Sequence, residues 1–345
     1  MRKLFILLLS FGLATSCSES SAEKGADTEN TKKELTTNDI DELESLIQTQ
    51  THADGLGNAL QRAHSIVYDW VLRQSRADDS EKQSLNRLLD KSISEELTSL
   101  KGHLTNEDDL GILTEINTQY DAWKNHVTII QEALPDFMAY DEIINVFEAQ
   151  AALESENSAF DKLIANIKTL QVSSSDAIKS KFDELLSNGS NKPLEKAWAA
   201  YKVSDQLVNF ILAAELANIN LSKWSAVESD SDAPEKIQLN AFVETTAPEF
   251  IETLELVDTD WNPDDQETFA TFSYALNSFL EAIQSIQNAL PNKEAYQDPM
   301  NFFMTFEFNE QAQSSFDQMQ RDARLLWMNK KDEYTRLLAD IKASL

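Results

Sequence analysis

Two stretches that lie 156 residues apart decide the fold: residues 129–147 read IIQEALPDFMAYDEIINVF, and residues 285–303 read SIQNALPNKEAYQDPMNFF. Nine positions are identical without a gap, including the Ala-Leu-Pro and Ala-Tyr pairs of each stretch. In the same register, residues 106–170 hold 17 identities over 65 positions, whereas chance at about 6% per position gives roughly 4. Trp70 and Trp224 match at the neighbouring offset of 154 residues. The pattern predicts one duplicated module.

Apolar residues recur at helical spacing in both copies. In the first copy, one seam steps by four and three residues through Leu56, Leu60, Ala63, Val67 and Trp70. Each copy therefore predicts four helices, over residues 37–76, 81–102, 106–134 and 139–186 in the first and 193–227, 234–257, 263–290 and 300–343 in the second. The expected fold is all-α, with two tandem, duplicated four-helix modules whose long helices are shared or abut. The modules span residues 37–186 and 193–345, and residues 187–192 form the linker.

The composition of the 345 residues is that of a globular protein, with 42% hydrophobic residues and only 7 Gly and 7 Pro. Asp and Glu total 59 against 29 Lys and Arg, which gives a formal net charge of −30. Nucleic-acid binding needs clustered Lys and Arg against the phosphates, so this charge argues against it. The single cysteine excludes an intrachain disulfide and a cysteine-based zinc site.

The N-terminal residues indicate an export signal. Arg2 and Lys3 precede an apolar run of about a dozen residues, which is too short to span a bilayer. Cys17, the only cysteine, follows directly. This segment resembles a bacterial lipoprotein signal, which implies that residues 1–16 are removed and that Cys17 carries lipid chains as a membrane anchor. Residues 17–36 are polar and predict a disordered acidic tether.

The residue after the cysteine carries the sorting information that this resemblance implies. Ser18 stands where Asp would retain a lipoprotein in the inner membrane. The expected location is therefore the outer membrane, with the anchored protein facing the periplasm. The alternative location is the periplasmic face of the inner membrane.

No motif for catalysis or for a cofactor is present in the sequence. There is no Gly-x-Ser-x-Gly, P-loop or Gly-x-Gly-x-x-Gly segment. The histidines lack the spacings of helical metal sites, so each is expected to be an ordinary core or surface residue: His52, His64, His103 and His126. Gly55 and Gly57 are expected to kink or loosen the first helix. We therefore expect neither an enzyme nor a cofactor nor a metal site.

Aromatic and basic side chains are the candidates for ligand binding. Trp70, Trp123 and Trp224 lie at helical seam spacing, where core packing is the default role and an aromatic-lined pocket in the bundle is the alternative. Arg62 and Arg73 on the first helix could then bind a carboxylate. Neither arginine has an arginine at the matching position of the second copy.

The first and last helices carry opposite charges near the chain ends. Acidic residues open the first helix and basic residues mark the last: Asp39, Asp41, Glu42 and Glu44 against Arg321, Arg324, Lys330, Lys331 and Arg336. We expect these ends to pack against each other and to tie the termini of the body together.

Two groups of proteins are similar to this chain. It resembles a family of bacterial helical lipoproteins of unknown function in its lipidation signal, its acidic tether and the pattern Tyr68-Asp69-Trp70 late in the first helix. A later helix with Glu281-Ala282 that ends before Pro291 adds to this resemblance. It implies that the family's fold covers most of residues 38–345. The chain is also similar to the helical bimodular sensory domain of chemoreceptors, which stacks two related bundles and implies a ligand-binding role.

Two functions follow as hypotheses. The first is a non-enzymatic envelope lipoprotein that acts as a periplasmic protein-interaction or scaffold module, with an envelope protein as its partner. The alternative is binding of a small organic ligand or a cation within a helical bundle, in a sensor or solute-binding role. An interaction protein exposes an apolar patch, whereas a binding module encloses a pocket with convergent polar groups.

Overall fold

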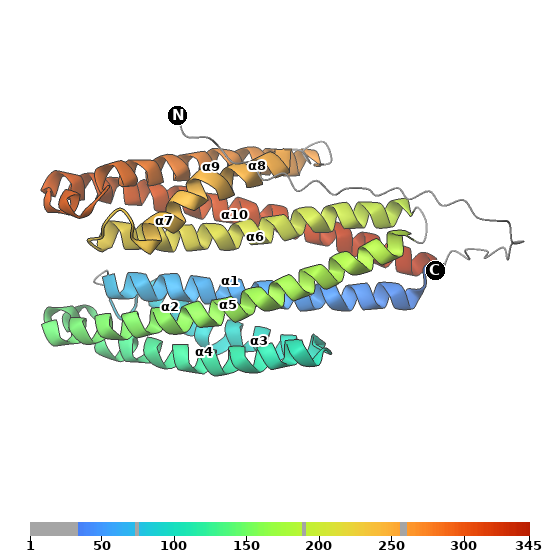
Figure 1. Ribbon diagram of the computed structural model, residues 1–345, viewed down its shortest axis with the longest axis horizontal. Helices are drawn as coiled ribbons and strands as arrows, with labels where there is room; N and C mark the ends of the chain where they lie inside the picture. Colours follow the sequence, from blue (N-terminus) through green and yellow to red (C-terminus); the bar gives the residue numbers. More distant parts are fainter. Residues whose placement is uncertain (1–33, 73–75, 188–190, 256–260) are drawn as a thin grey trace, which may run out of the picture. The chain divides into compact units, whose positions relative to one another are not determined.

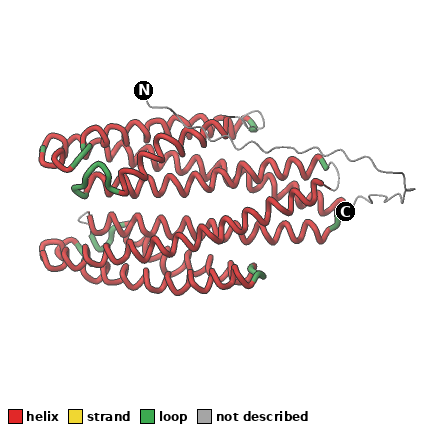
Figure 2. The backbone as a smooth tube through the Cα atoms, viewed as in Figure 1, coloured by secondary structure: helices red, strands yellow, loops and turns green. Residues whose placement is uncertain are grey.

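The computed structural model describes residues 34–72, 76–187, 191–255 and 261–345. Within these ranges the protein is all-α and contains no strand (Figure 2). The all-α prediction is therefore confirmed. The predicted signal, the lipidation site Cys17 and the candidate Arg73 lie outside the described residues. None of the described helices has both the length and the apolar character needed to cross a membrane.

Residues 34–187, which we call the first half, form a bundle of helices (Figure 1). They are α1 (Thr37–Leu72), α2 (Ser80–Arg87), the π-turn η1 (Leu88–Ser92), α3 (Ile93–His103), α4 (Glu107–Ala133), the 3-10 turn η2 (Phe137–Asp141) and α5 (Ile143–Ser187). The predicted helical ranges agree with these elements to within about one helical turn. α1 continues through Gly55 and Gly57 without a break, and the kink or loosening expected there stays a prediction.

Residues 191–345, the second half, contain the same order of elements (Figure 1). They are α6 (Lys192–Ala226), α7 (Pro234–Ala241), the π-turn η3 (Phe242–Thr246), α8 (Ala247–Glu255), α9 (Pro263–Ala289), the 3-10 turn η5 (Lys293–Gln297) and α10 (Pro299–Ser344). In both halves a π-turn interrupts the helix that the sequence predicts as continuous.

Side-chain caps explain where several of these helices begin. Asn106 and Asn262 accept hydrogen bonds from backbone N–H groups in the first turns of α4 and α9. A proline after each Ala-Leu pair cannot continue the helix. Asp136 and Asn292 then cap the 3-10 turns η2 and η5. The Ala-Leu-Pro stretches therefore mark sharp turns between long antiparallel helices, as the sequence predicts.

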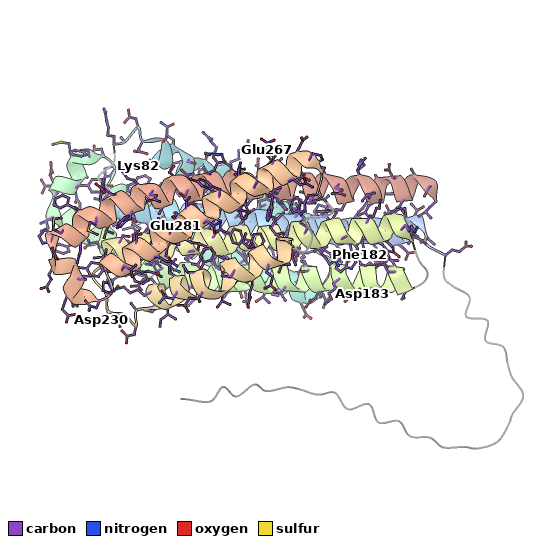
Figure 3. The ribbon with its side chains drawn as sticks, turned by 90° about the horizontal axis from the view of Figure 1, so that it is seen from above. Lys82, Phe182, Asp183, Asp230, Glu267 and Glu281 are labelled. Carbon is purple, nitrogen blue, oxygen red and sulfur yellow. The ribbon has the colours of Figure 1, made fainter. Side chains whose placement is uncertain are left out.

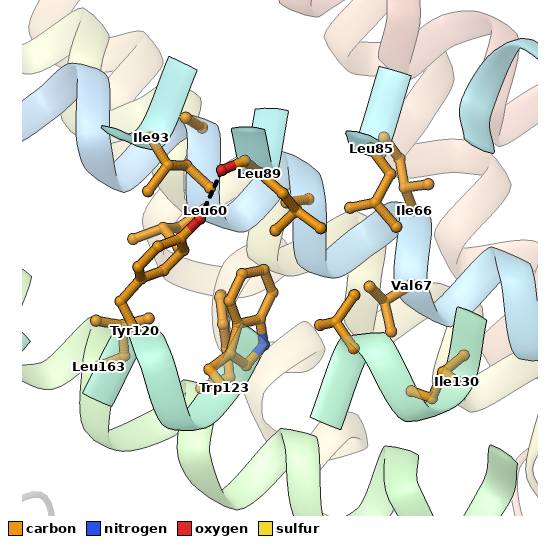
Figure 4. Packing of buried hydrophobic residues seen from close by; sticks show 14 of the residues in the cluster. Leu60, Ile66, Val67, Leu85, Leu89, Ile93, Tyr120, Trp123, Ile130 and Leu163 are labelled. Atoms are coloured by element: carbon orange, nitrogen blue, oxygen red, sulfur yellow. Dashed lines mark hydrogen bonds between the residues drawn. The ribbon is translucent and has the colours of Figure 1, made fainter. Parts of the chain in front are cut away.

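Three buried clusters hold the helices together. The cluster of the first half includes Leu60, Trp123 and Leu163 (Figure 4), and that of the second half is built around Phe272 and Phe279. The third cluster combines residues of both halves near the start of α1, with Ile40, Leu43, Ile178, Phe182, Leu194, Tyr201, Tyr334 and Leu338 among its members. Residues 34–345 therefore form one compact unit.

The surface of this unit is covered with carboxylates. Asp230, Glu267 and Glu281 are exposed (Figure 3). On α5, Phe182 is buried whereas its neighbour Asp183 is exposed (Figure 3). These examples place acidic side chains on the solvent faces of amphipathic helices.

The ends of α1 and α10 pack together as predicted, but with different basic partners. Lys342 pairs with Asp41 and with Glu44, whose Oε2 lies 2.9 Å from its Nζ. Lys181 of α5, not a residue of α10, lies 3.5 Å from Asp39. Most of the predicted cations lie too early on α10 to reach the start of α1; Arg324, for example, lies about 27 Å before Lys342 along the helix axis.

The central helices α1 and α6 run in the same direction. Gln50 and Asp205 line one cleft near their starts, and Arg62 and Glu215 line another nearer their ends. The turn between α4 and α5 and the turn between α9 and α10 consequently lie at the same end of the body (Figure 1). That end is opposite to the one at which α1 begins.

Candidate functional site

The carbonyl group that ends α4 is held by two side chains. Pro135 has no N–H to donate, and the carbonyl of Leu134 lies past the last helical residue. Trp70 Nε1 donates to this carbonyl at 2.8 Å and Lys82 Nζ donates to it at 3.1 Å. The Lys82 ammonium also lies 4.3 Å from the centre of the Trp70 ring. The Tyr140 hydroxyl donates to the Trp70 carbonyl, so Trp70 is hydrogen-bonded to residues on both sides of Pro135.

The second half contains the corresponding contacts. Trp224 Nε1 donates to the Leu290 carbonyl at 2.8 Å, and Lys236 Nζ donates to the same oxygen at 3.2 Å. The Tyr296 hydroxyl donates to the Trp224 carbonyl. The predicted ligand-binding candidates Trp70 and Trp224 thus hold turns, and neither lines the clefts described below. Sequence reasoning missed the two lysines, although they match at the same 154-residue offset as the tryptophans.

Trp123, the third tryptophan candidate, belongs to a buried polar cluster. Its Nε1 donates to Glu156 Oε1, and His64 Nδ1 lies 2.6 Å from the same oxygen. The His64 ring stacks on Phe160 at 3.8 Å between centroids. Glu156 is 0% exposed and its Oε2 has no hydrogen-bond partner. A buried carboxylate is costly unless it is hydrogen-bonded, so this cluster depends on both donors.

The second half has no such cluster. The residues that correspond to His64, Trp123 and Glu156 are Asn218, Phe279 and Ala312. Phe279 and Ala312 belong to a fully apolar part of the core. The fold therefore does not require the polar cluster. Sequence reasoning missed it because His64 was treated alone, and its partner Glu156 lies 92 residues away in the sequence.

Arg62 lies at a cleft of about 510 Å³ between the two halves. Its wall also carries Arg324, whose Nη1 donates to Asn58 at 2.9 Å and whose Nη2 donates to Glu215 at 3.3 Å. Burial raises the pKa of Glu215 and lowers that of Arg324. Acidic Glu215 and Asp317 line the same cleft and would repel a carboxylate. The binding of a carboxylate by Arg62 stays a prediction.

A second cluster surrounds Asp54 on α1. Gln50 Nε2 donates to its two carboxyl oxygens at 3.1 and 3.2 Å, and Gln171 Nε2 donates at 2.9 Å. Burial and the nearby charge of Asp205 raise the pKa of Asp54 to about 8, so this carboxyl is mostly protonated at neutral pH. Gly57 leaves room for this arrangement, because a Cβ there would lie 3.2 Å from Gln171 Nε2.

The turns at the far end of the body expose large apolar side chains. We call the exposed apolar residues of η2 and α5 the first tip, and those of α10 the second tip. The first tip comprises Phe137, Met138, Ile143, Ile144 and Phe147, and the second comprises Met300, Phe303, Met304 and Phe306. Their exposed fractions run from 42% for Met304 to 71% for Ile143 and Ile144. Both tips lie at the end of the body opposite to the start of α1 (Figure 1).

No group of three or more His, Asp or Glu side chains in the described part of the chain is arranged to hold a metal ion. The geometry therefore offers two kinds of binding feature: polar clefts beside α1 and apolar tips at one end.

Comparison with protein-family models, with curated proteins and with solved structures finds no match to this chain.

Proposed function

We propose that the protein is a non-enzymatic envelope lipoprotein whose helical body binds a partner protein through its two apolar tips. The exposure of the tips carries this proposal, because contiguous exposed apolar side chains mark interaction sites. Ile144 matches Met300, and Phe147 matches Phe303, so both tips offer a similar surface. Methionine and aromatic residues are the types enriched in protein interfaces.

The charges around the tips define the partner further. Asp141, Glu142 and Asp298 are exposed beside the apolar residues, and the whole chain carries a net charge of −30. An anionic lipid surface would repel such a rim. The partner that fits is a protein with apolar pockets bordered by Lys and Arg, because complementary charges speed encounter and fix orientation.

The position of the tips supports a protein partner over the anchoring membrane. The 36 residues of α1 separate the start of the body from the tip end by about 54 Å. We place the anchor on Cys17 at the start of the body, so the tips at the opposite end would lie away from the lipid surface. The outer membrane is the proposed location, and the periplasmic face of the inner membrane is the alternative.

The proposal includes a duplicated origin for the two tips. The paired contacts of Trp70 with Leu134 and of Trp224 with Leu290 support duplication of one four-helix module. The π-turns η1 and η3 fall at corresponding positions and support it as well. Duplication explains why one chain carries two similar docking surfaces. Kinship with the family of helical lipoproteins is a further part of this proposal.

The test is site-specific photo-crosslinking in intact cells of the source. A photoreactive residue at position 144 and another at position 300 should each capture the same discrete protein. Phe147→Ser should weaken binding to that protein by about 10- to 100-fold, the range of a central interface residue. Since Phe147 is 61% exposed, its replacement should leave the melting temperature within about one degree of wild type.

A photoreactive residue at the exposed position 183, at the other end of α5, is the matched control and should not capture that protein. Crosslinks to lipid alone, to a second copy of the chain, or to different proteins from the two tips would contradict the proposal. So would binding that Phe147→Ser leaves unchanged.

The anchor has its own test. Cys17→Ser should abolish incorporation of labelled palmitate and should move the protein from the membrane fraction to the soluble fraction, because the lipid chains are its proposed membrane contact. Retention of the variant in the membrane fraction without label would contradict the anchor and leave the tip proposal to its separate test.

A further inference from the structure

A cleft of about 450 Å³ lies between α1, α5 and α6, away from the tips. Gln50 and Gln61 of α1 form part of its wall, and Asp205 of α6 faces it near Gln50. Leu212 and Leu216 supply an apolar surface along α6. The cleft thus combines polar groups, which include Gln50, Gln61 and Asp205, with an apolar surface on Leu212 and Leu216.

Two buried acceptors in this wall have no partner. Gln50 and Gln61 are 6% and 4% exposed, and the Oε1 atom of each lacks a hydrogen bond. The amide nitrogen of Gln50 is already used, because it donates to Asp54. Buried polar atoms are nearly always satisfied in folded proteins, so these two oxygens call for donors from outside the chain.

The charges in the cleft favour a cation at the Gln50 end. Asp205 is half-buried there, and the exposed Asp176 also lines the cleft. Burial raises the pKa of Asp205 to about 6, so it is ionised at neutral pH. Lys168, the cation in the wall, is exposed at the surface. An anion would meet the Asp205 carboxylate, whereas an ammonium group offers three donors to it and to the Gln50 oxygen.

The spacing of the two glutamines sets the length of the ligand. They lie 11 residues apart on α1, which is about 16 Å along the helix axis. An extended chain of six methylene groups, with a donor at each end, matches this spacing.

We propose that this cleft binds an elongated aliphatic primary amine with a second hydrogen-bond donor at its far end. The ammonium group donates to Asp205 and to Gln50 Oε1, the methylene chain lies against Leu212 and Leu216, and the far donor reaches Gln61 Oε1. This site goes beyond the interaction function and is independent of the tips.

The experiment measures thermal unfolding of the full-length chain by its tryptophan fluorescence, with 6-amino-1-hexanol as the probe. At saturation the probe should raise Tm by several degrees. Hexylamine lacks the far donor and 1,6-hexanediol lacks the ammonium, so the first should act at about tenfold higher concentration and the second should have no effect. Asp205→Asn should weaken the probe's apparent affinity at least tenfold, and Gln61→Met should make the probe no better than hexylamine.

Asp317→Asn, in the other cleft, removes the same charge and serves as the matched control that keeps the full response. An absent shift, an equal shift with the diol, or an undiminished response in Asp205→Asn would overturn the proposal. An equal loss in Asp317→Asn would assign the effect to net charge and would also overturn it.

Discussion

His64→Leu is expected to lower the free energy of unfolding by about 3–5 kcal/mol, because it removes one partner of a buried His–Glu pair and leaves the other partner buried. Glu156 is fully buried, and its Oε1 is shared by His64 and Trp123 while its Oε2 has no partner. Removal of the imidazole leaves the carboxylate with the indole N–H as its remaining hydrogen bond. Urea denaturation followed by circular dichroism measures the loss, with the m-value checking that the unfolded state is unchanged.

The second half provides the control for this prediction. Because Phe279 and Ala312 pack there without polar partners, the combined variant His64→Leu, Trp123→Phe and Glu156→Met should recover most of the lost stability. Replacement of a whole buried polar cluster by apolar side chains of similar volume is often neutral or stabilising. A triple variant as unstable as His64→Leu would mean that the loss comes from packing of the imidazole on Phe160 and not from the unpaired carboxylate.

The helices could be predicted from the sequence because their signals are local. Apolar spacing, asparagine caps and the proline after each Ala-Leu pair act within one or two turns of the chain. The π-turns η1 and η3 could not be predicted, since they result from how one helix packs against its neighbours. The partners of Asp41 and Glu44 were also missed, because the axial position of α10 beside α1 depends on the whole bundle.

The candidate sites were harder to predict because they combine residues far apart in the sequence. Glu156 and His64 are 92 residues apart, and Gln171 and Asp54 are 117 apart. No spacing rule links such pairs. The tryptophans were named as candidates for ligand binding, with core packing as their default role. Their hydrogen-bond partners could not be predicted: the Leu134 and Leu290 carbonyls hold Trp70 and Trp224 at the turns. The interaction hypothesis required an exposed apolar patch, but the residues of the two tips were not identified from the sequence.

Asp54→Asn is expected to remove a large part of the dependence of stability on pH. The folded-state pKa of Asp54, about 8, lies above its unfolded value of 3.8. The unfolded chain therefore releases this proton first, and the stability that Asp54 contributes is complete below pH 4 and declines as the pH rises to about 8. Each unit of difference corresponds to about 1.4 kcal/mol, so the loss across this range amounts to several kcal/mol. Lys331 of α10 offsets a part of it.

The variant removes the titration but keeps the shape of the side chain. Its amide nitrogen replaces one carboxyl oxygen and faces the amide donor of Gln50, which costs about 1–3 kcal/mol at every pH. We therefore expect Asp54→Asn to be less stable than wild type at pH 4 and more stable than wild type at pH 8, where the difference is about 2 kcal/mol or more. Urea denaturation at pH 4, 6 and 8 locates the pH at which the two proteins are equally stable. Asp183→Asn, on the exposed face of α5, should show no such crossing.

Asp205→Asn separates burial from charge repulsion as the cause of the shift in Asp54. The carboxylate of Asp205 contributes to the raised pKa of Asp54 after burial. Its removal should therefore move the upper end of the stability decline to lower pH without abolishing it. Abolition would mean that repulsion dominates, whereas a decline that persists in Asp54→Asn itself would assign the pH dependence to another group. Gln50 donates to Asp54 and also lines the cleft proposed to bind an amine. If 6-amino-1-hexanol changes the pH at which wild type and Asp54→Asn are equally stable, the two sites are coupled.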